Sequence, residues 1–258
     1  MTLRINLNAD IAEGYGAYDI GNDPELMKII GSASVACGFH AGDANTMHRL
    51  CMLARQNHVS VGVHPGFNDL WGFGRRRISM SPQDLEYMVA YQIGALQAMA
   101  QYAGLKVTHL KAHGALNNLA AEREDYAMAI GRAMKTVDRD LIYVALYGSE
   151  MEKAARRLDL PLAREGFADR AYEDDGNLAS RGIAGTVHKD PKIALQQCLM
   201  MIQEKQLISR HGNKVKVEVE TICLHGDEPT AVHVAGEVQK GLEMAGVKLL
   251  TIPEMLRP

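Results

Sequence analysis

The sequence predicts an α/β fold in which parallel strands form a β/α barrel. Short β-prone segments alternate with segments of helical periodicity along the whole chain. Seven or eight strand segments can be counted, and such a number is typical of a barrel. A chain of 258 residues, 47% of them hydrophobic, has enough apolar material for one large core, so we expect one domain over residues 1–258.

The expected strands begin close to the N-terminus and recur to the end of the chain. They cover residues 4–8, 34–39, 59–63, 106–110, 141–146, 162–167, a run from 215–219 into 221–224, and a weak segment at 247–251. Parallel strands need long crossover connections, which the helical segments between them supply. The helices are therefore expected to cover the outside of the barrel.

Three helices are expected to begin where an N-cap residue precedes a proline, because proline fits the first helical position without the loss of a hydrogen bond. These starts are Asp23-Pro24, Ser81-Pro82 and Asp190-Pro191. Apolar residues recur every three or four positions over 85–103, and Gly104 then ends the helix. A similar stripe over 231–245 precedes Gly246, so both helices have a face for a core.

Two long segments lack this alternation. Residues 64–80 are rich in Gly, Arg and Asp, and residues 168–189 have a similar composition. Loops longer than about 12 to 15 residues are uncommon in compact domains and often form lids or binding segments. We therefore expect both segments to contribute to a binding site.

Composition and charge exclude several classes of function. The formal net charge is −3, from 28 basic and 31 acidic residues, and no basic tail or long charge run is present, which argues against nucleic-acid binding. Neither a signal peptide nor a membrane-spanning segment is evident, so we expect no membrane association and a cytoplasmic location. The four cysteines are widely spaced without a CxxC pattern, which favours reduced thiols. Association of several copies of the chain stays open.

Chemically capable side chains follow almost every expected strand. In chain order they are Asp10 and Glu13, His40 and Asp43, His64, then His109, Lys111 and His113 on alternate residues, Asp169 and Arg170, and finally His225 and Asp227. The carboxyl ends of parallel barrel strands meet at one mouth, where barrel enzymes bind their substrates. The sequence therefore predicts an active site at this mouth.

Some of these residues also have a simple structural interpretation. Asp43 and Asp227 stand where helices begin, so capping a helix explains them as well as a role in the site does. Cys37 and Cys223 lie near strand ends, but buried cysteines that pack as small apolar residues are more common than nucleophiles.

Two kinds of ligand fit the expected mouth, a divalent metal ion and an anion. Asp10, His40 and His64 could converge on a metal, although no HxxxH or HExxH spacing supports this interpretation. The run Arg75-Arg76-Arg77 lies in a glycine-bearing loop and favours a clamp for phosphate or carboxylate over a merely solvated face. Neither GxxxxGK[ST] nor a GxGxxG that opens a helix is present, so a nucleotide would need another kind of cradle.

Eight motifs in register resemble the LamB/YcsF family and together cover essentially the whole chain. They lie at residues 7–16, 36–43, 63–66, 72–76, 91–96, 111–118, 167–172 and 222–227, and they include Asn8-Ala9-Asp10, Gly38-Phe39-His40, His64-Pro65-Gly66, Lys111-Ala112-His113 and His225-Gly226-Asp227. Eight motifs in the family's order are far more specific than any single short pattern.

The resemblance implies both a fold and an activity. The fold is a seven-stranded, TIM-like β/α barrel resembling the glycoside hydrolase/deacetylase superfamily. The activity is ATP-dependent cleavage of the small lactam 5-oxoproline (pyroglutamate) to L-glutamate, with release of ADP and phosphate. The chain would act as the A component of this 5-oxoprolinase, together with subunits B and C. ATP would be required, and a divalent metal ion is the second cofactor to be considered.

The motifs and the resemblance together give the expected site. The catalytic set is Asp10, Glu13, Lys111, His113, Asp169 and Arg170; the substrate- and phosphate-binding set is Arg75, Arg76, Asn117, His225 and Asp227; the metal set is Asp10, His40 and His64. Four positions depart from the family pattern: Ala12 replaces Gly, Ala112 replaces Pro, Asn117 replaces Tyr, and Glu220-Thr221 replaces Asp-Ser. Of these, Asn117 bears most on the shape of the pocket and hence on the substrate.

We hypothesise that ATP phosphorylates the lactam oxygen, which gives an imidate-like phosphate that water attacks while phosphate leaves. Lys111 and an arginine of the 75–76 pair would stabilise the phosphoryl charge, with His113 or Asp10 as the base for water. His40 and His64 would hold a metal or polarise the carbonyl. Two alternatives stay open: a metal-dependent amide hydrolase or carbohydrate deacetylase that does not use ATP, and a non-catalytic subunit that binds a lactam or carbohydrate.

Overall fold

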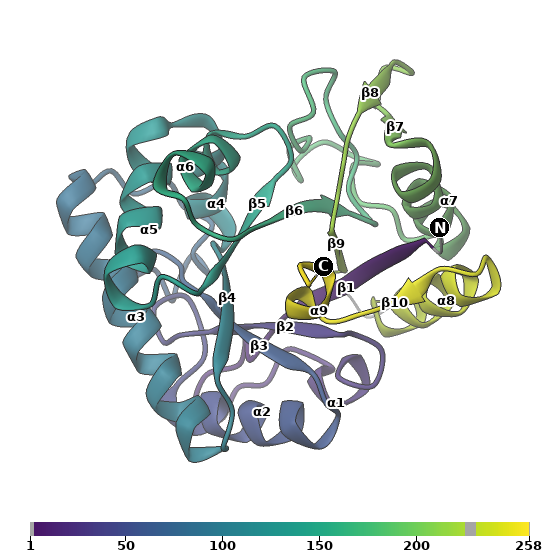
Figure 1. Cartoon of the computed structure of the whole chain (residues 1–258). Coiled ribbons are helices and arrows are strands. Elements are labelled where there is room, and N and C mark those ends of the chain that lie inside the picture. Colours follow the sequence, from purple (N-terminus) through teal and green to yellow (C-terminus); the bar gives the residue numbers. More distant parts are fainter. Residues whose placement is uncertain (1–2, 225–230, 258) are drawn as a thin grey trace.

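The computed structural model describes residues 3–224 and 231–257, and its centre is a closed barrel of parallel strands (Figure 1). The seven strands of the ring are β1 (Arg4–Ile11), β2 (Ser32–Ala36), β3 (Ser60–His64), β4 (Val107–Lys111), β5 (Ile142–Leu146), β6 (Leu162–Phe167) and β9 (Thr221–Leu224). Each strand pairs with the next, and β9 pairs with both β6 and β1, which closes the ring. The predicted seven-stranded α/β barrel is confirmed. A short strand, β10 (Lys248–Leu249), pairs with the start of β1.

Most of the helices surround the barrel on its outer side, whereas the short α9 (Ile252–Met255) lies at the amino-terminal end of the ring, where Ile252 packs against Ile142, Val144 and Ala163 (Figure 1). The other helices are α1 (Asp23–Leu26), α2 (Ala44–Gln56), α3 (Pro82–Tyr102), α4 (Gly114–Glu122), α5 (Glu124–Val137), α6 (Glu150–Leu158), α7 (Pro191–Leu199) and α8 (Ala231–Met244), and α7 continues as a π-helical turn over Met200–Glu204. The apolar core lies between these helices and the strands. Within the described ranges, no helix combines the length and the apolar character needed to cross a membrane.

A helix begins at each of the three predicted starts, and the predicted N-cap residue is confirmed at two of them. Ser81 caps α3 and Asp190 caps α7, each by accepting a hydrogen bond from a backbone N–H of the first turn. Asp43 caps α2 in the same way. The prediction that Asp23 is an N-cap was wrong, because Asp23 lies inside α1 and its buried carboxylate accepts a hydrogen bond of 3.0 Å from the N–H of Ala12.

The predicted apolar face of α3 is buried against the barrel. Its fully buried residues include Leu85, Val89, Ile93 and Leu96. Gln92 lies on the same face, where its amide exchanges two hydrogen bonds of 3.0 Å with the backbone of Gly66. The stripe of α8 is buried up to Leu242, but Ala245 is exposed because the helix ends at Met244.

Four strand predictions were wrong in their extent. The first strand continues past position 8 to Ile11, and the segment predicted at 247–251 is only the two-residue β10. The run from 215–219 into 221–224 is not one strand, since Lys214–Lys216 (β8) pairs with Gln206–Ile208 (β7) in a separate antiparallel hairpin. Alternation of apolar and polar residues cannot show that the chain changes sheets between two β segments. The second strand ends at Ala36 instead of position 39, because Gly38 takes a φ of +95° and turns the chain.

The side chains of β1 that point into the barrel are polar. Asn6 donates to the hydroxyl of Ser32 (2.9 Å) and accepts from that of Thr221 (2.7 Å). Asn8 donates to Thr221 (2.7 Å) and to the carboxylate of Glu165 (2.9 Å). Barrel interiors are normally filled by branched apolar side chains, so this network is unusual. The hydrogen-bond network extends through the barrel interior from the amino-terminal half to the carboxyl-terminal mouth.

Candidate active site

A polar cavity of about 480 Å³ opens at the carboxyl ends of the strands. Its walls include Asp10, Glu13, His64, Lys111 and His113. These side chains come from the ends of β1, β3 and β4 or from the residues that directly follow them. The structure therefore brings together residues that the sequence places in separate motifs.

Lys111 places a buried positive charge in the cavity. Its ammonium Nζ lies 2.9 Å from the carboxylate of Asp10 and 3.0 Å from that of Glu165. It also lies 3.1 Å from the amide oxygen of Asn8 and 2.9 Å from Sγ of Cys223. Burial alone would lower the pKa of Lys111, but the two carboxylates outweigh it and raise the pKa well above its ordinary value. Lys111 is therefore a fixed cation.

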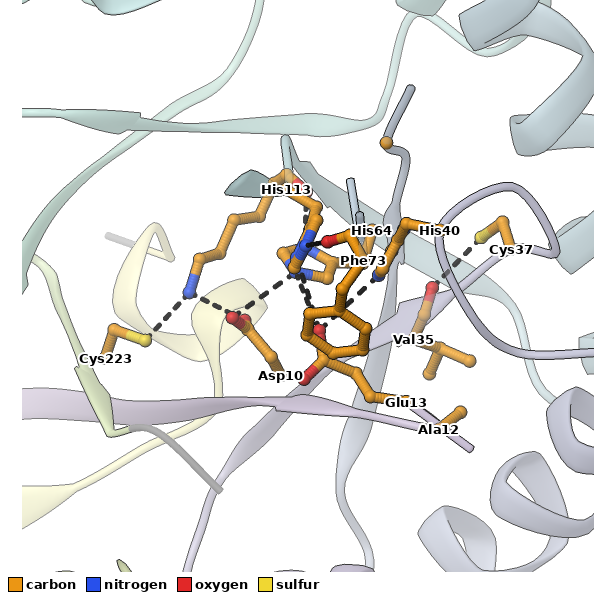
Figure 2. Close-up of polar contacts among 12 residues, drawn as sticks. Asp10, Ala12, Glu13, Val35, Cys37, His40, His64, Phe73, His113 and Cys223 are labelled. Atoms are coloured by element: carbon orange, nitrogen blue, oxygen red, sulfur yellow. Dashed lines mark hydrogen bonds and ion pairs between the residues drawn. The ribbon is translucent and has the colours of Figure 1, made fainter. Parts of the chain in front are cut away.

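Beside Lys111, three histidines gather around the carboxylate of Glu13 (Figure 2). Oε1 of Glu13 lies 3.2 Å from Nδ1 of His113, 3.4 Å from Nε2 of His40 and 4.0 Å from Nε2 of His64. The ring of His40 stacks on that of His113, with centroids 3.7 Å apart and planes 5° from parallel. We call these four residues the His/Glu cluster.

Burial controls the charge of the His/Glu cluster. It lowers the pKa of His40 to about 3, so this imidazole is neutral. Burial would raise the pKa of Glu13, but the neighbouring imidazoles of His113 and His40 hold it well below its usual range. Glu13 is therefore an ionised carboxylate among imidazoles.

Backbone carbonyls fix the tautomers of two of these histidines. Nδ1 of His64 lies 2.7 Å from the carbonyl oxygen of Lys111, and Nε2 of His113 lies 2.8 Å from that of Phe73. Because a carbonyl can only accept, both of these ring nitrogens carry the hydrogen. In the neutral rings, the remaining lone pairs on Nε2 of His64 and Nδ1 of His113 then face each other at 3.0 Å. Such lone pairs beside a carboxylate repel one another unless a cation or a proton lies between them.

The His/Glu cluster fits a divalent metal ion. Its four donor atoms lie within 4.8 Å of one another, and outer hydrogen bonds to carbonyls are the usual way in which metal-binding histidines are oriented. Imidazole and carboxylate donors suit zinc and related ions. The cluster shares His40 and His64 with the predicted metal set. Asp10 lies alongside, with Oδ2 3.3 Å from Nε2 of His64.

Two glycines of the 64–80 segment let the chain pass close to the cluster. A Cβ on Gly66 would lie 2.6 Å from Nδ1 of His40. Gly74 has a φ of +63°, and a Cβ there would lie 2.8 Å from both His40 and His113. The glycine-rich composition of this segment thus serves close backbone approach to the histidines.

The cysteines behave as the sequence suggested, as buried thiols without a disulfide. The thiol of Cys37 donates to the carbonyl of Val35 at 3.0 Å, and burial raises its pKa to about 12 (Figure 2). Cys223 contacts Lys111 but also has a pKa raised well above its ordinary value by burial. Neither thiol is arranged as an activated nucleophile.

The three arginines of the 75–77 run take different positions. Arg76 forms a forked hydrogen bond with the buried carboxylate of Asp69, with Nε 2.9 and 3.1 Å from its two oxygens. Arg77 pairs with Glu122 (2.9 Å), and both line the cavity. Arg75 also lines the cavity, whereas Arg76 does not. Two arginines of the expected clamp therefore lie in the cavity wall, whereas Arg76 stabilises its own loop.

The remaining predicted site residues lie at three places. Arg170 and Asn117 line the cavity, the latter from α4. Asp169 is buried next to Arg170 and is not part of the cavity wall. His225 and Asp227 lie outside the described residues. His109 points into the barrel below Lys111, and burial lowers its pKa to about 3.

Sequence reasoning missed Glu165, whose carboxylate pairs with the ammonium of Lys111. The available signal was the position of Glu165 in the strand, between Ala163 and Phe167 on the alternate residues that face the barrel interior. It also missed how two of the family departures act. Ala12 has a φ of +64°, a conformation that favours glycine, and Thr221 holds Asn8 within the interior network.

Comparison with known proteins agrees with this architecture. A model of the LamB/YcsF family matches residues 5–257. The chain is 48% identical over 246 residues to the 5-oxoprolinase A component of Rhodopseudomonas palustris, covering 95% of this chain and 97% of that protein. It is also 40% identical to a lactam utilization protein of Thermus thermophilus, whose crystal structure superposes with a TM-score of 0.92. The alignment covers 97% of this chain and 100% of that chain.

A more distant structure shares the fold alone. The catalytic domain of a peptidoglycan N-acetylglucosamine deacetylase from Eubacterium rectale has a TM-score of 0.53 at 9% identity, with 100% of this chain and 91% of that chain covered.

Proposed function

The chain belongs to the LamB/YcsF family, and from this premise we propose that it acts as the A component of an ATP-hydrolysing 5-oxoprolinase. This enzyme would open the lactam of 5-oxoproline to L-glutamate, with subunits B and C as partners. The structural observation that carries the proposal is one cavity in which the fixed cation Lys111 adjoins Asp10 and the His/Glu cluster. Such a cavity can stabilise an oxyanion and activate water at the same carbon.

Lactam hydrolysis needs activation because resonance makes the carbonyl carbon a poor electrophile. Transfer of a phosphoryl group from ATP to the lactam oxygen would weaken this resonance. Water then bonds to the carbon, the C–N bond breaks, and the ring nitrogen takes up a proton. The phosphoryl group must stay until the C–N bond has broken, because its earlier loss would restore the amide. This order replaces the sequence-based hypothesis in which phosphate leaves as water attacks; a second water then releases phosphate from the acyl phosphate.

Lys111 would stabilise negative charge on the oxygen of the reacting carbon. It is held by Asn8, Asp10 and Glu165, so its position needs no rearrangement as the charge develops. Removal of one such electrostatic group from an active site typically costs about 10²–10³ in rate.

Asp10 would be the base for water. Its Oδ1 pairs with Lys111, and its Oδ2 lies 3.3 Å from His64 at the cavity wall. Oδ2 would take the proton of the attacking water and return it to the ring nitrogen as the C–N bond breaks.

Glu13, His40, His64 and His113 would hold a divalent metal ion. A bound metal ion would supply Lewis-acid polarisation of the substrate oxygen and a lower pKa for a nearby water. The cluster's own contribution is the fixed tautomers of His64 and His113, which direct two lone pairs to one point.

The test is release of glutamate from 5-oxoproline by the chain alone and by the chain with subunits B and C, with and without ATP. We expect release only from the three-subunit mixture and only with ATP, with one phosphate formed per glutamate. Glutamate release that is independent of ATP, or unaffected by omission of this chain, would contradict the proposal.

A metal-dependent amide hydrolase or deacetylase without ATP is the second candidate. The observation that favours it is the pair of facing lone pairs in the His/Glu cluster, which is a metal-site arrangement in its own right. It predicts amide or acetyl cleavage by the metal-loaded chain in the absence of nucleotide. A merely binding subunit would bind lactam and give unchanged complex activity when Lys111 is replaced.

A further inference from the structure

The wall of the cavity formed by the segment between β6 and α7 carries two arginines, Arg170 and Arg181. Arg170 is 7% exposed, and its Nη2 donates to the carbonyl of Ala179 at 2.5 Å. Its Nε has no hydrogen-bond partner within the described ranges. A buried guanidinium with unused donors costs free energy, and such groups normally have a partner.

The backbone around Arg170 is rigidly supported. Its carbonyl accepts from the amide of Gln197 at 2.9 Å, and the next residue, Ala171, donates to the carbonyl of Thr186 at 2.9 Å. The N–H of His188 donates to the carbonyl of Asp169 at 2.8 Å. The segment therefore places Arg170 at the cavity by its own hydrogen bonds.

The two arginines also stand close enough to repel each other. Burial, and next the charge of Arg181, lower the pKa of Arg170 to about 10. The neighbouring Asp169 acts in the opposite direction but does not cancel this effect. Two like charges at one cavity wall are typical of a site that becomes stable when an anion binds.

We propose that Arg170 and Arg181 form an oxyanion-binding subsite in the cavity, built from the segment between β6 and α7 and not from the residues of the His/Glu cluster or the Arg75–Arg77 run. It binds the carboxylate or phosphate group of a bound ligand through charge-assisted hydrogen bonds. The inference rests on the proposed function for its two candidate sources, the carboxylate of 5-oxoproline and the phosphates of ATP. In either case the anion is held at one wall while Lys111 and Asp10 act at the other part of the cavity.

The test measures ligand binding to the full chain by titration calorimetry. The ligands are 5-oxoproline, 2-pyrrolidinone, which is the same lactam without the carboxylate, and ATP. The variants are Arg181→Ala and Arg170→Lys, and the matched control is Arg139→Ala, an exposed arginine before β5. Loss of a charge-assisted hydrogen bond should weaken binding of one anion by about ten- to a hundredfold.

The pattern of losses identifies the source of the anion. If it is the carboxylate, 5-oxoproline binds the unmodified chain more tightly than 2-pyrrolidinone, and Arg181→Ala removes the difference. If it is phosphate, only ATP binding weakens. Wild-type affinity for both anions in Arg181→Ala and Arg170→Lys, with unchanged melting temperatures, would overturn the subsite, as would failure of the unmodified chain to bind either anion. The two proposals can be tested separately, because binding is measured without turnover. Lack of activity in the three-subunit complex would contradict the proposed function, but it would not change the measured anion binding.

Discussion

A single lysine balances two carboxylates at the centre of the molecule. Asp10 and Glu165 both lie within 3.0 Å of Nζ of Lys111, and the buried carboxylate of Glu165 would be an uncompensated charge without it. Removal of one partner from a buried ion pair is strongly destabilising, by about 3–5 kcal/mol. Stability and catalysis are therefore coupled at this residue, and a test of its role must separate them.

Lys111→Met should reduce turnover of the assembled enzyme by about a hundredfold or more, because the oxyanion loses its fixed cation. Glutamate release per minute is the readout, and urea melts of the isolated variant show how much folded protein remains. Lys106→Met is the control, since Lys106 is exposed just before the same strand. Turnover within a factor of a few of the unmodified enzyme, in a folded variant, would remove Lys111 from the mechanism.

Asp23 should make stability depend on pH. Burial raises its pKa from 3.8 to about 6, so the native state binds this proton more tightly than the unfolded chain does. Its contribution is complete below pH 3.8 and is lost as the pH rises through about 6. Asp23→Asn, which stays neutral and can still accept from Ala12, should be more stable than the unmodified chain at pH 7 by roughly 2–3 kcal/mol.

The measurement is the free energy of unfolding in urea at pH 4 to 7. Asp23→Asn should lack the decline of the unmodified chain across this range, whereas Asp140→Asn, an exposed carboxylate, should retain it. Parallel curves for Asp23→Asn and the unmodified chain would show that Asp23 is ionised throughout.

At the scale of elements, the tight turn after β2 places His40. Gly42 has a φ of +80°, and a Cβ there would clash with the carbonyl oxygen of Ala36. Gly148 has nearly the same φ, +78°, with nothing within 4 Å of the added Cβ. The two positions separate backbone strain from steric contact.

Gly148→Ala should therefore cost about 1 kcal/mol, the usual penalty of a left-handed conformation. Gly42→Ala should cost at least ~2 kcal/mol more, because the turn must also shift. Thermal unfolding of both variants checks the difference. Equal losses would mean that the turn accommodates the methyl group and that its position is not tightly fixed.

The elements also show where sequence reasoning succeeds and fails. Periodicity and capping located α3 and the barrel strands, because both depend on neighbouring residues. The same reasoning joined 215–219 to 221–224, since nothing local marks the change from the β7–β8 hairpin to β9. It also placed Asp23 as a cap, because its contact with Ala12 joins residues 11 positions apart through the fold.

In the site, too, local sequence patterns predicted part of the arrangement, and contacts that depend on the fold could not be predicted. Strand ends predicted Asp10, His64, Lys111 and His113 as neighbours, because a barrel delivers its strand ends to one mouth. Which carboxylate faces the histidines could not be predicted, since it depends on the turn at Ala12 that carries Glu13 into the cluster.

Across the whole molecule, the His/Glu cluster joins four successive parts of the barrel. Glu13 follows β1, His40 follows β2, His64 ends β3 and His113 precedes α4. A metal ion bound to all four would link these segments, and it would have no equivalent site in the unfolded chain. Metal affinity should therefore appear as stability of the fold.

Saturating Zn²⁺ or Mn²⁺ should raise the melting temperature of the chelator-treated chain, because a ligand at about 100 times its Kd adds ~2.7 kcal/mol to the native state. His64→Ala should abolish the rise, since the cluster loses a ligand that Lys111 orients through its carbonyl. His48→Ala, an exposed histidine on α2, should keep it. An equal rise in His64→Ala would place the metal elsewhere on the molecule. No rise with either ion would mean that a proton, and not a metal, separates the lone pairs of His64 and His113.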